Sequence, residues 1–242
     1  MFAFRTTIGP VELAFTDRHG GVSAAPFDSL NLSIAGEDDE RAKAENHRLL
    51  LAEFAPGAHS HADLYQVHSS RVVVLERGAG PGRPEADGIV TARAGTPLLV
   101  RAADCVPVLF ADPERGVVGA AHAGRRGVQA DVVTRVVDTM AELGASGVQA
   151  WIGPHICGRC YEVPALMREE VAAAVPATWA ETSWGTPSLD LGAGIAAQLG
   201  AAGVQVHLQV RCTLEDDDFF SYRRDAGRSG RHAGIVMLRE RP

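Results

Sequence analysis

A series of short apolar runs occupies the middle of this chain and limits the possible folds more than any other feature. The runs are rich in β-branched residues, as buried strands usually are. They cover residues 71–75, 88–91, 97–101, 106–111 and 116–121. The next segment, residues 127–143, carries valines at helical spacing and ends at Gly144, so it predicts one long amphipathic helix. We therefore expect a sheet that is covered by a helix.

The flanking segments predict a similar mixture of elements. Two short strands are expected in residues 3–15, and single strands at residues 148–153, 204–210 and 232–238. Helical spacing is found at residues 38–54, 165–174 and 190–201. Because the elements do not follow a strict βαβ repeat, the predicted class is α/β, in the form of a mixed-sheet α+β sandwich. No linker or charge block divides the sequence, so we expect a single domain over residues 1–242.

Composition and charge exclude several classes of protein. With 46% hydrophobic and 22% charged residues, the chain has the make-up of a soluble globular protein. The net charge is -7 without a basic stripe, so nucleic acid is not an expected partner. No apolar run is long enough for a signal peptide or a membrane span, which predicts a cytoplasmic protein without membrane contacts. In that compartment the four cysteines are expected to be reduced thiols.

An acid and a thiol, Asp104 and Cys105, interrupt the apolar stretch between two predicted strands. Burying such groups costs free energy unless each finds a proton, a metal or a hydrogen-bond partner. Cys105 alone is also consistent with an inert buried cysteine. The neighbouring Asp104 favours a functional site.

His122 is expected at the carboxyl end of a buried strand, just before a glycine turn and the predicted long helix. Arg125 and Arg126 follow at the start of that helix, where free N–H groups and positive charge can hold an anion such as phosphate. The alternative is an ordinary strand-to-helix turn with a packed histidine and solvent-facing arginines.

His68 taken alone would usually be a structural histidine, and it becomes a candidate metal ligand only in combination with Cys105 and His122. It precedes a predicted strand and stands among polar residues that can orient its ring. The imidazoles of His68 and His122 and the thiolate of Cys105 make a three-ligand zinc set with a fourth position left for water, which is the catalytic pattern. Copper is a weaker alternative, because a multicopper oxidase needs several paired histidines and the sequence has one HxH, at residues 59–61.

A second group of thiols lies further along the chain. Cys157 and Cys160 form a CxxC motif, which is typical of a redox pair or of half a zinc site. Cys212 is a possible third thiol, and His155 stands two residues before the motif. The βαβ context of a thioredoxin-like site is missing, so we interpret the motif as mainly structural.

An acidic run at residues 215–218 is followed by aromatic residues and by Arg223 and Arg224. Acidic runs are usually solvated surfaces. The aromatic rings and arginines could instead stack on a base and bind an anion. Both interpretations stay open.

Taken together, these motifs resemble those of the YfiH-type or laccase-domain proteins, a family described as purine nucleoside phosphorylases and earlier as multicopper polyphenol oxidases. The likeness covers nearly the whole chain in the right order. The matching segments are FTDRHGGVSAAPFDSLNL at 15–32, QVHSS at 66–70, ADGIVT at 86–91, ADCVPVLFAD at 103–112, AAHAGRRG at 120–127, IGPHICGRCYEV at 152–163 and FFSYRRDAGRSGRHAGIVML at 219–238.

The resemblance implies zinc bound by His68, Cys105 and His122. It also implies phosphorolysis of adenosine, inosine and S-methyl-5'-thioadenosine, and deamination of adenosine, on a sandwich similar to the catalytic domain of cytotoxic necrotizing factor. Cys105, His122 and Asp104 are then the expected catalytic residues, with Asp104 moving a proton while zinc activates water or stabilises the leaving purine.

For substrate binding we expect Arg125 and Arg126 to hold phosphate and Asn31 and Arg223 to contact the nucleoside. The chain departs from the family at Arg125, where tryptophan is usual, and this argues against base stacking at that position.

Two other functions stay open. One is a metal-free cysteine hydrolase that edits peptidoglycan precursors, with Cys105 as nucleophile and His122 as base. The other is a non-catalytic binding module, for which ligand binding would be unaffected by the loss of Cys105.

Overall fold

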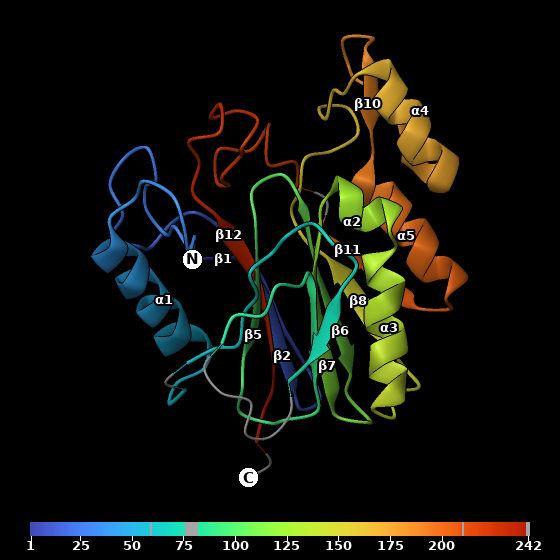
Figure 1. The fold of residues 1–242 in the computed structure, drawn as a ribbon. Helices are drawn as coiled ribbons and strands as arrows, with labels where there is room; N and C mark the ends of the chain where they lie inside the picture. The colour runs from blue at the N-terminus through green and yellow to red at the C-terminus, as the bar shows by residue number, and fades with distance from the viewer. Residues whose placement is uncertain (59, 76–81, 210, 241–242) are drawn as a thin grey trace.

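Two β-sheets pack face to face between helices in the computed structural model, which describes residues 1–58, 60–75, 82–209 and 211–240 (Figure 1). The four-stranded sheet has the order β1-β2-β12-β5, made of Phe2–Ile8, Val11–Thr16, His232–Leu238 and Leu98–Ala102. The six-stranded sheet has the order β11-β8-β6-β7-β4-β3, made of Gln205–Leu208, Gln149–Ile152, Val106–Asp112, Val117–Ala123, Gly88–Thr91 and Val72–Val74. A separate hairpin pairs β9 with β10, which are Trp179–Glu181 and Pro187–Leu189.

Helices cover both outer faces of the sandwich. The α-helices α1 to α5 are Glu40–Phe54, Arg125–Gln129, Val132–Glu142, Ala165–Ala174 and Leu191–Ala201, and the 3-10 helix η1 is Pro176–Thr178. In Figure 1, α1 lies on the side of the four-stranded sheet, and α3 and α5 lie on the opposite side. The result is a layered order of helix, sheet, sheet and helices, which confirms the predicted mixed α/β class.

Three apolar clusters match these layers. The central cluster joins residues such as Leu13 and Val100 of the four-stranded sheet to Leu109 and Val118 of the six-stranded sheet. A second cluster packs α3 and α5 on the six-stranded sheet, and a third packs α1 on the four-stranded sheet. Strands buried on both faces read as continuous apolar runs, which explains why the sequence pattern located them well.

Most strand neighbours are antiparallel, but β3 with β4 and β11 with β8 are parallel. Each predicted strand is present with ends shifted by a few residues at most. Val210 of the predicted strand 204–210 lies outside the described residues, as does His59 of the HxH motif. His61 of that motif faces Asp63 at 3.4 Å, and its ring stacks on His47.

The prediction of a single helix over residues 127–143 is wrong. The structure has two helices there, α2 and α3, separated at Asp131, whose φ of 57° is left-handed. Asp131 is the N-cap of α3, and its carboxylate accepts a bond from the amide of Thr134 at 3.4 Å. A side chain that caps a new helix interrupts the old one, although the valine spacing continues across the break.

The chain crosses from one sheet to the other directly after β5. Ala103, Asp104 and Cys105 form the link from β5 of the four-stranded sheet to β6 of the six-stranded sheet. Asp104 takes a φ of 81° there, which L-residues rarely adopt.

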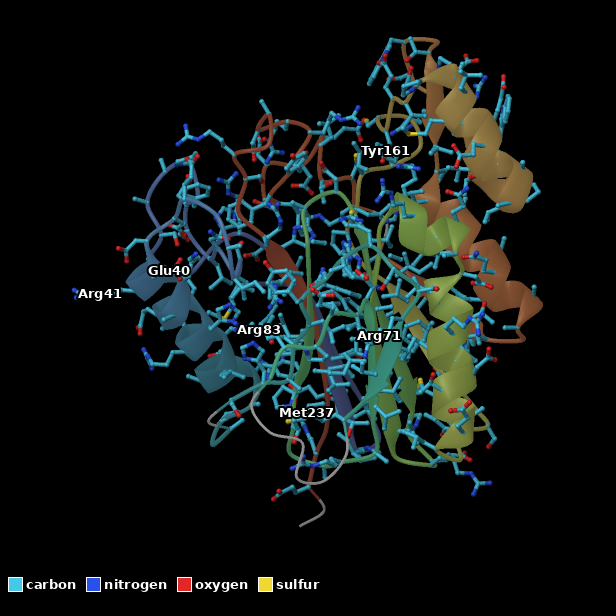
Figure 2. All side chains as sticks on the ribbon, viewed as in Figure 1. Glu40, Arg41, Arg71, Arg83, Tyr161 and Met237 are labelled. Atoms are coloured by element: carbon cyan, nitrogen blue, oxygen red, sulfur yellow. The ribbon has the colours of Figure 1, made fainter. Side chains whose placement is uncertain are left out.

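Figure 2 places Tyr161 at the upper end of the sheets and Met237 at the opposite end, near the C-terminus. No helix among the described residues has the length and apolar character needed to cross a membrane.

Candidate functional site

The structure brings His68, Cys105 and His122 together, with one ligand atom from each lying within 4.8 Å of the others. The register of β6 against β7 explains the closeness of two of them, because Val106 pairs with Ala123. Cys105 and His122 therefore lie side by side at the same end of this ladder. The ring of His68 meets the ring of His122 edge-on, with centroids 4.8 Å apart.

Asp87, which the sequence analysis did not single out, holds both histidines of the cluster in place. Its Oδ1 accepts bonds from His122 Nδ1 at 2.8 Å and from the amide of His68 at 3.0 Å. Its Oδ2 accepts from the amide and hydroxyl of Ser69, at 2.6 and 2.8 Å. A carboxylate on Nδ1 fixes the tautomer and leaves Nε2 as the free nitrogen, as in many carboxylate–histidine–metal arrangements.

The charges of these neighbouring groups also shift one another's pKa values. Burial would lower the pKa of His122, but Cys105 and Asp87 outweigh burial and raise it to about 9. The pKa of His68 is lowered by burial and by the neighbouring His122. Burial would raise the pKa of Asp87, but hydrogen bonds from His122 and Ser69 lower it, so the carboxylate stays ionised.

Gly124 lets the backbone approach His68 and Cys105 closely. A Cβ at this position would collide with Nδ1 of His68 and lie 3.1 Å from Sγ of Cys105. Two imidazoles and a thiol suit a divalent ion with nitrogen and sulfur ligands. The donor set therefore fits zinc by its chemistry.

A cavity of about 670 Å³ opens over this cluster. His68, Cys105 and His122 line it together with Asp104, which is buried. Asp104 Oδ1 accepts from the hydroxyl of Thr213 at 2.7 Å and Oδ2 from the amide of Arg223 at 2.6 Å. The carboxylate is thus held in one orientation beside Cys105.

Arginines and tyrosines make the rest of the wall amphipathic. The side chain of Arg223 lies over the ring of Tyr161, 5.2 Å from its centroid, and Arg231 lies 5.7 Å from the centroid of Tyr222. All four residues line the cavity, as does Arg101. Arg101 is buried and already bonded to Asp63 at 2.6 Å. The sequence analysis did not single out Arg231 or Arg101, because their place in the wall depends on how distant segments of the chain pack together.

Three of the predicted substrate residues lie outside this lining. Arg125 and Arg126 occupy the first turn of α2, next to the cluster but not in the cavity wall. Asn31 is buried, where its amide group donates to Asp38 at 2.8 Å and accepts from the amide of Arg231 at 2.9 Å. Asn31 therefore contacts the wall through Arg231, and its predicted contact with substrate stays a prediction.

Within the described ranges of the chain, a second group of side chains could also hold a metal ion. Cys157, Cys160, Cys212 and Glu215 each offer one atom within 4.8 Å of the others. His155 is not part of this group, and its Nδ1 bonds to the carbonyl of Gly153 at 2.8 Å. All four cysteines are free thiols.

The fold and the His–Cys–His cluster point to a class of α/β proteins that carry metal-ligand residues where two sheets join. The chain belongs to the family described as multi-copper polyphenol oxidoreductase laccase, whose model matches residues 12–239. The family resemblance seen in the sequence motifs is thereby confirmed.

Close relatives are named for a different activity. The chain is 51% identical over 235 residues to purine nucleoside phosphorylase ORF3 of Streptomyces griseus, with 95% of each chain covered. It is 48% identical to purine nucleoside phosphorylase SCO2081 of Streptomyces coelicolor, with 98% of this chain and 100% of the relative covered.

Solved structures share the whole fold. The Neisseria meningitidis protein NMB0706 has a TM-score of 0.87 and 31% identity, covering 98% of this chain and 99% of its own. YlmD from Geobacillus stearothermophilus has a TM-score of 0.87 and 34% identity, covering 96% of this chain and 93% of its own.

Proposed function

We propose that this protein is a zinc-dependent purine nucleoside phosphorylase that acts on adenosine, inosine and S-methyl-5'-thioadenosine. One observation carries the proposal: the His68–Cys105–His122 cluster faces a cavity whose volume of about 670 Å³ is in the range of small-ligand sites. The names of the two Streptomyces relatives supply the substrate class.

The cavity wall offers groups suited to each part of the reaction. Tyr161 and Tyr222 present aromatic surface on which a purine can stack. Arg223 and Arg231 supply positive charge for phosphate inside the cavity, and Arg125 and Arg126 supply more at the start of α2. When bound by the cluster, zinc supplies a Lewis acid with an open coordination position.

Asp104 is the proposed proton carrier. Asp104 lies next to Cys105 and is kept in one orientation by Thr213 and Arg223. A carboxylate so fixed can accept or return a proton at the purine, which also suits deamination of adenosine to inosine. We include that deamination as a second activity of the same site.

The direct test is to incubate the protein with adenosine, with and without phosphate, and to separate adenine from inosine. Phosphorolysis predicts adenine and ribose 1-phosphate that require phosphate, whereas deamination predicts inosine in both reactions. The absence of both products, from protein that contains zinc, would contradict the proposal.

The arrangement of Asp87, His122 and Cys105 favours one other function. The carboxylate bonds to one side of the imidazole, and the thiol lies on its other side, as in a cysteine hydrolase. In that case the substrate class would be the peptidoglycan precursors expected from the sequence. Alkylation of Cys105 would then abolish turnover by metal-stripped protein, whereas a zinc enzyme has no turnover to lose in that state.

Copper would replace zinc in the proposal if metal analysis of the purified protein found copper alone.

A further inference from the structure

The second thiol group joins two distant segments of the chain. Cys157 and Cys160 stand in the loop between β8 and α4, and Cys212 and Glu215 stand in the segment between β11 and β12. A backbone bridge between His155 and Cys212 lays the two segments side by side. The amide of Cys157 donates to Sγ of Cys212 at 3.4 Å, so a sulfur of one segment is already oriented toward the other.

We propose that Cys157, Cys160, Cys212 and Glu215 bind a second zinc ion, which has a structural role. Three sulfurs and one carboxylate oxygen supply four ligands, which is the number that closes a tetrahedral structural site. The two-residue spacing of Cys157 and Cys160 is the usual spacing of paired zinc ligands. The proposal is independent of the proposed enzymatic activity.

The local bonding suits a metal better than it suits a disulfide. Three thiols meet at one point, so any single disulfide would leave one of them unpaired. Cys160 is buried, although Glu215 is exposed and can admit an ion from solvent. Arg159 lies 3.7 Å from Glu215 and can offset part of the negative charge that three thiolates and a carboxylate would bring.

Each cysteine of this second site is next in sequence to a residue that lines the cavity or bonds to Asp104. Ile156 precedes Cys157 and donates its amide to the carbonyl of Asp104 at 3.1 Å. Tyr161 follows Cys160 and lines the cavity. Thr213 follows Cys212 and donates to the carboxylate of Asp104. A zinc ion here would hold that wall of the cavity in place without touching the substrate.

Zinc content of purified variants tests the proposal. We expect about two zinc ions per chain in the wild type and about one in either Cys105→Ala or Cys160→Ser. If the proposed active-site zinc does not exist, Cys105→Ala will match the wild type while Cys160→Ser still loses zinc, so the two proposals fail separately. Equal zinc content in the wild type and Cys160→Ser would overturn the second site.

Glu215→Gln and Asp217→Asn form a matched pair that keeps the test independent of folding. Both residues are exposed in the same acidic run, but only Glu215 belongs to the thiol group. We expect Glu215→Gln to lower the affinity for zinc at this site about tenfold or more and Asp217→Asn to leave it unchanged. Equal affinities in the two variants would overturn Glu215 as a ligand.

Cobalt substitution identifies the ligands by spectroscopy. Cobalt(II) bound to three thiolates should absorb in the near ultraviolet about three times as strongly as cobalt bound to one, because each sulfur contributes its own charge-transfer band. In Cys105→Ala we expect this strong band to remain. Its absence, or a disulfide between Cys157 and Cys160 in freshly purified protein detected by mass spectrometry, would overturn the proposal.

Discussion

The two candidate metal sites differ in their donors and in what supports them. The His68–Cys105–His122 cluster has two imidazoles and one thiol, and His122 is part of strand β7 in the core. The Cys157–Cys160–Cys212–Glu215 cluster has three thiols and a carboxylate, all on loops. Three donors leave a coordination position open for a substrate, whereas four donors close around an ion.

The two clusters also differ in the residues that surround them. Asp87, fully buried, fixes the first cluster with several hydrogen bonds, and a cavity lies directly above it. The second cluster has the exposed Arg159 as its charged neighbour and is absent from the cavity lining. From the number of donors and the nearby cavity, we expect the first cluster to take part in the reaction and the second to stabilise the fold.

Replacing Cys105 should have the largest effect and separate the sites most clearly. For Cys105→Ala we expect kcat/KM for phosphorolysis to fall by about 10³-fold or more, because a metal ligand in contact with the reaction is lost. The thermal midpoint should change far less than in the variants of the second cluster. Steady-state kinetics with adenosine and phosphate measures the first effect, and calorimetry measures the second. Unchanged kinetics in Cys105→Ala would reverse the assignment of roles.

Removing the charge of Asp87 should weaken the first site alone. In Asp87→Asn the amide cannot serve His122 Nδ1 and the Ser69 donors equally well, so we expect zinc affinity at this site to fall about 10–100-fold. Competition with a chromophoric chelator provides the measurement. Zinc affinity at the second cluster should stay the same, and a parallel fall at both sites would indicate general unfolding instead.

A variant of the second cluster should act mainly on stability. For Cys212→Ser we expect the protein to lose about 2 kcal/mol of zinc-linked stability, which would lower the thermal midpoint by about 4–8 °C. The same midpoint should be reached by treating the wild type with a chelator that removes zinc from the second cluster only. A variant as stable as the wild type would contradict a structural role.

The smallest predicted effect concerns the link between the sites. Thr213→Val removes the hydroxyl that bonds to Asp104 but no metal ligand. This hydrogen bond orients the carboxylate, and losing the roughly 1 kcal/mol that it contributes predicts a kcat lower by about fivefold. Zinc content at both sites should remain as in the wild type. If kcat is unaffected, Thr213 does not position Asp104 for the reaction.

The sequence predicted the cluster because Cys105 interrupts and His122 ends an apolar run, which is a local signal, and because His68 adds a second imidazole to complete a zinc set. Asp87 gives the same kind of signal just before β4, but its importance depends on a distant pairing. In the register of β4 against β7, Gly88 faces Ala121, and this places Asp87 beside His122. Such long-range registers cannot be deduced from the spacing of residues along the chain.

The fold was predicted well where burial dominates and poorly where a single side chain decides. Apolar runs located the strands, but the break between α2 and α3 depends on the left-handed backbone and cap at Asp131. The hairpin of β9 and β10 carries few apolar residues, and its sequence gave no strand signal. The likeness to the toxin catalytic domain, the single-domain organisation and the cytoplasmic location stay predictions.

Anomalous diffraction at the zinc absorption edge, from crystals of the purified protein, tests the two-site account most directly. The account predicts two peaks of anomalous density, one surrounded by His68, Cys105 and His122 and the other by the three remaining cysteines and Glu215. The first should have an additional solvent or substrate ligand, and the second should have none. A single peak, or a first site closed by a fourth protein ligand, would contradict it.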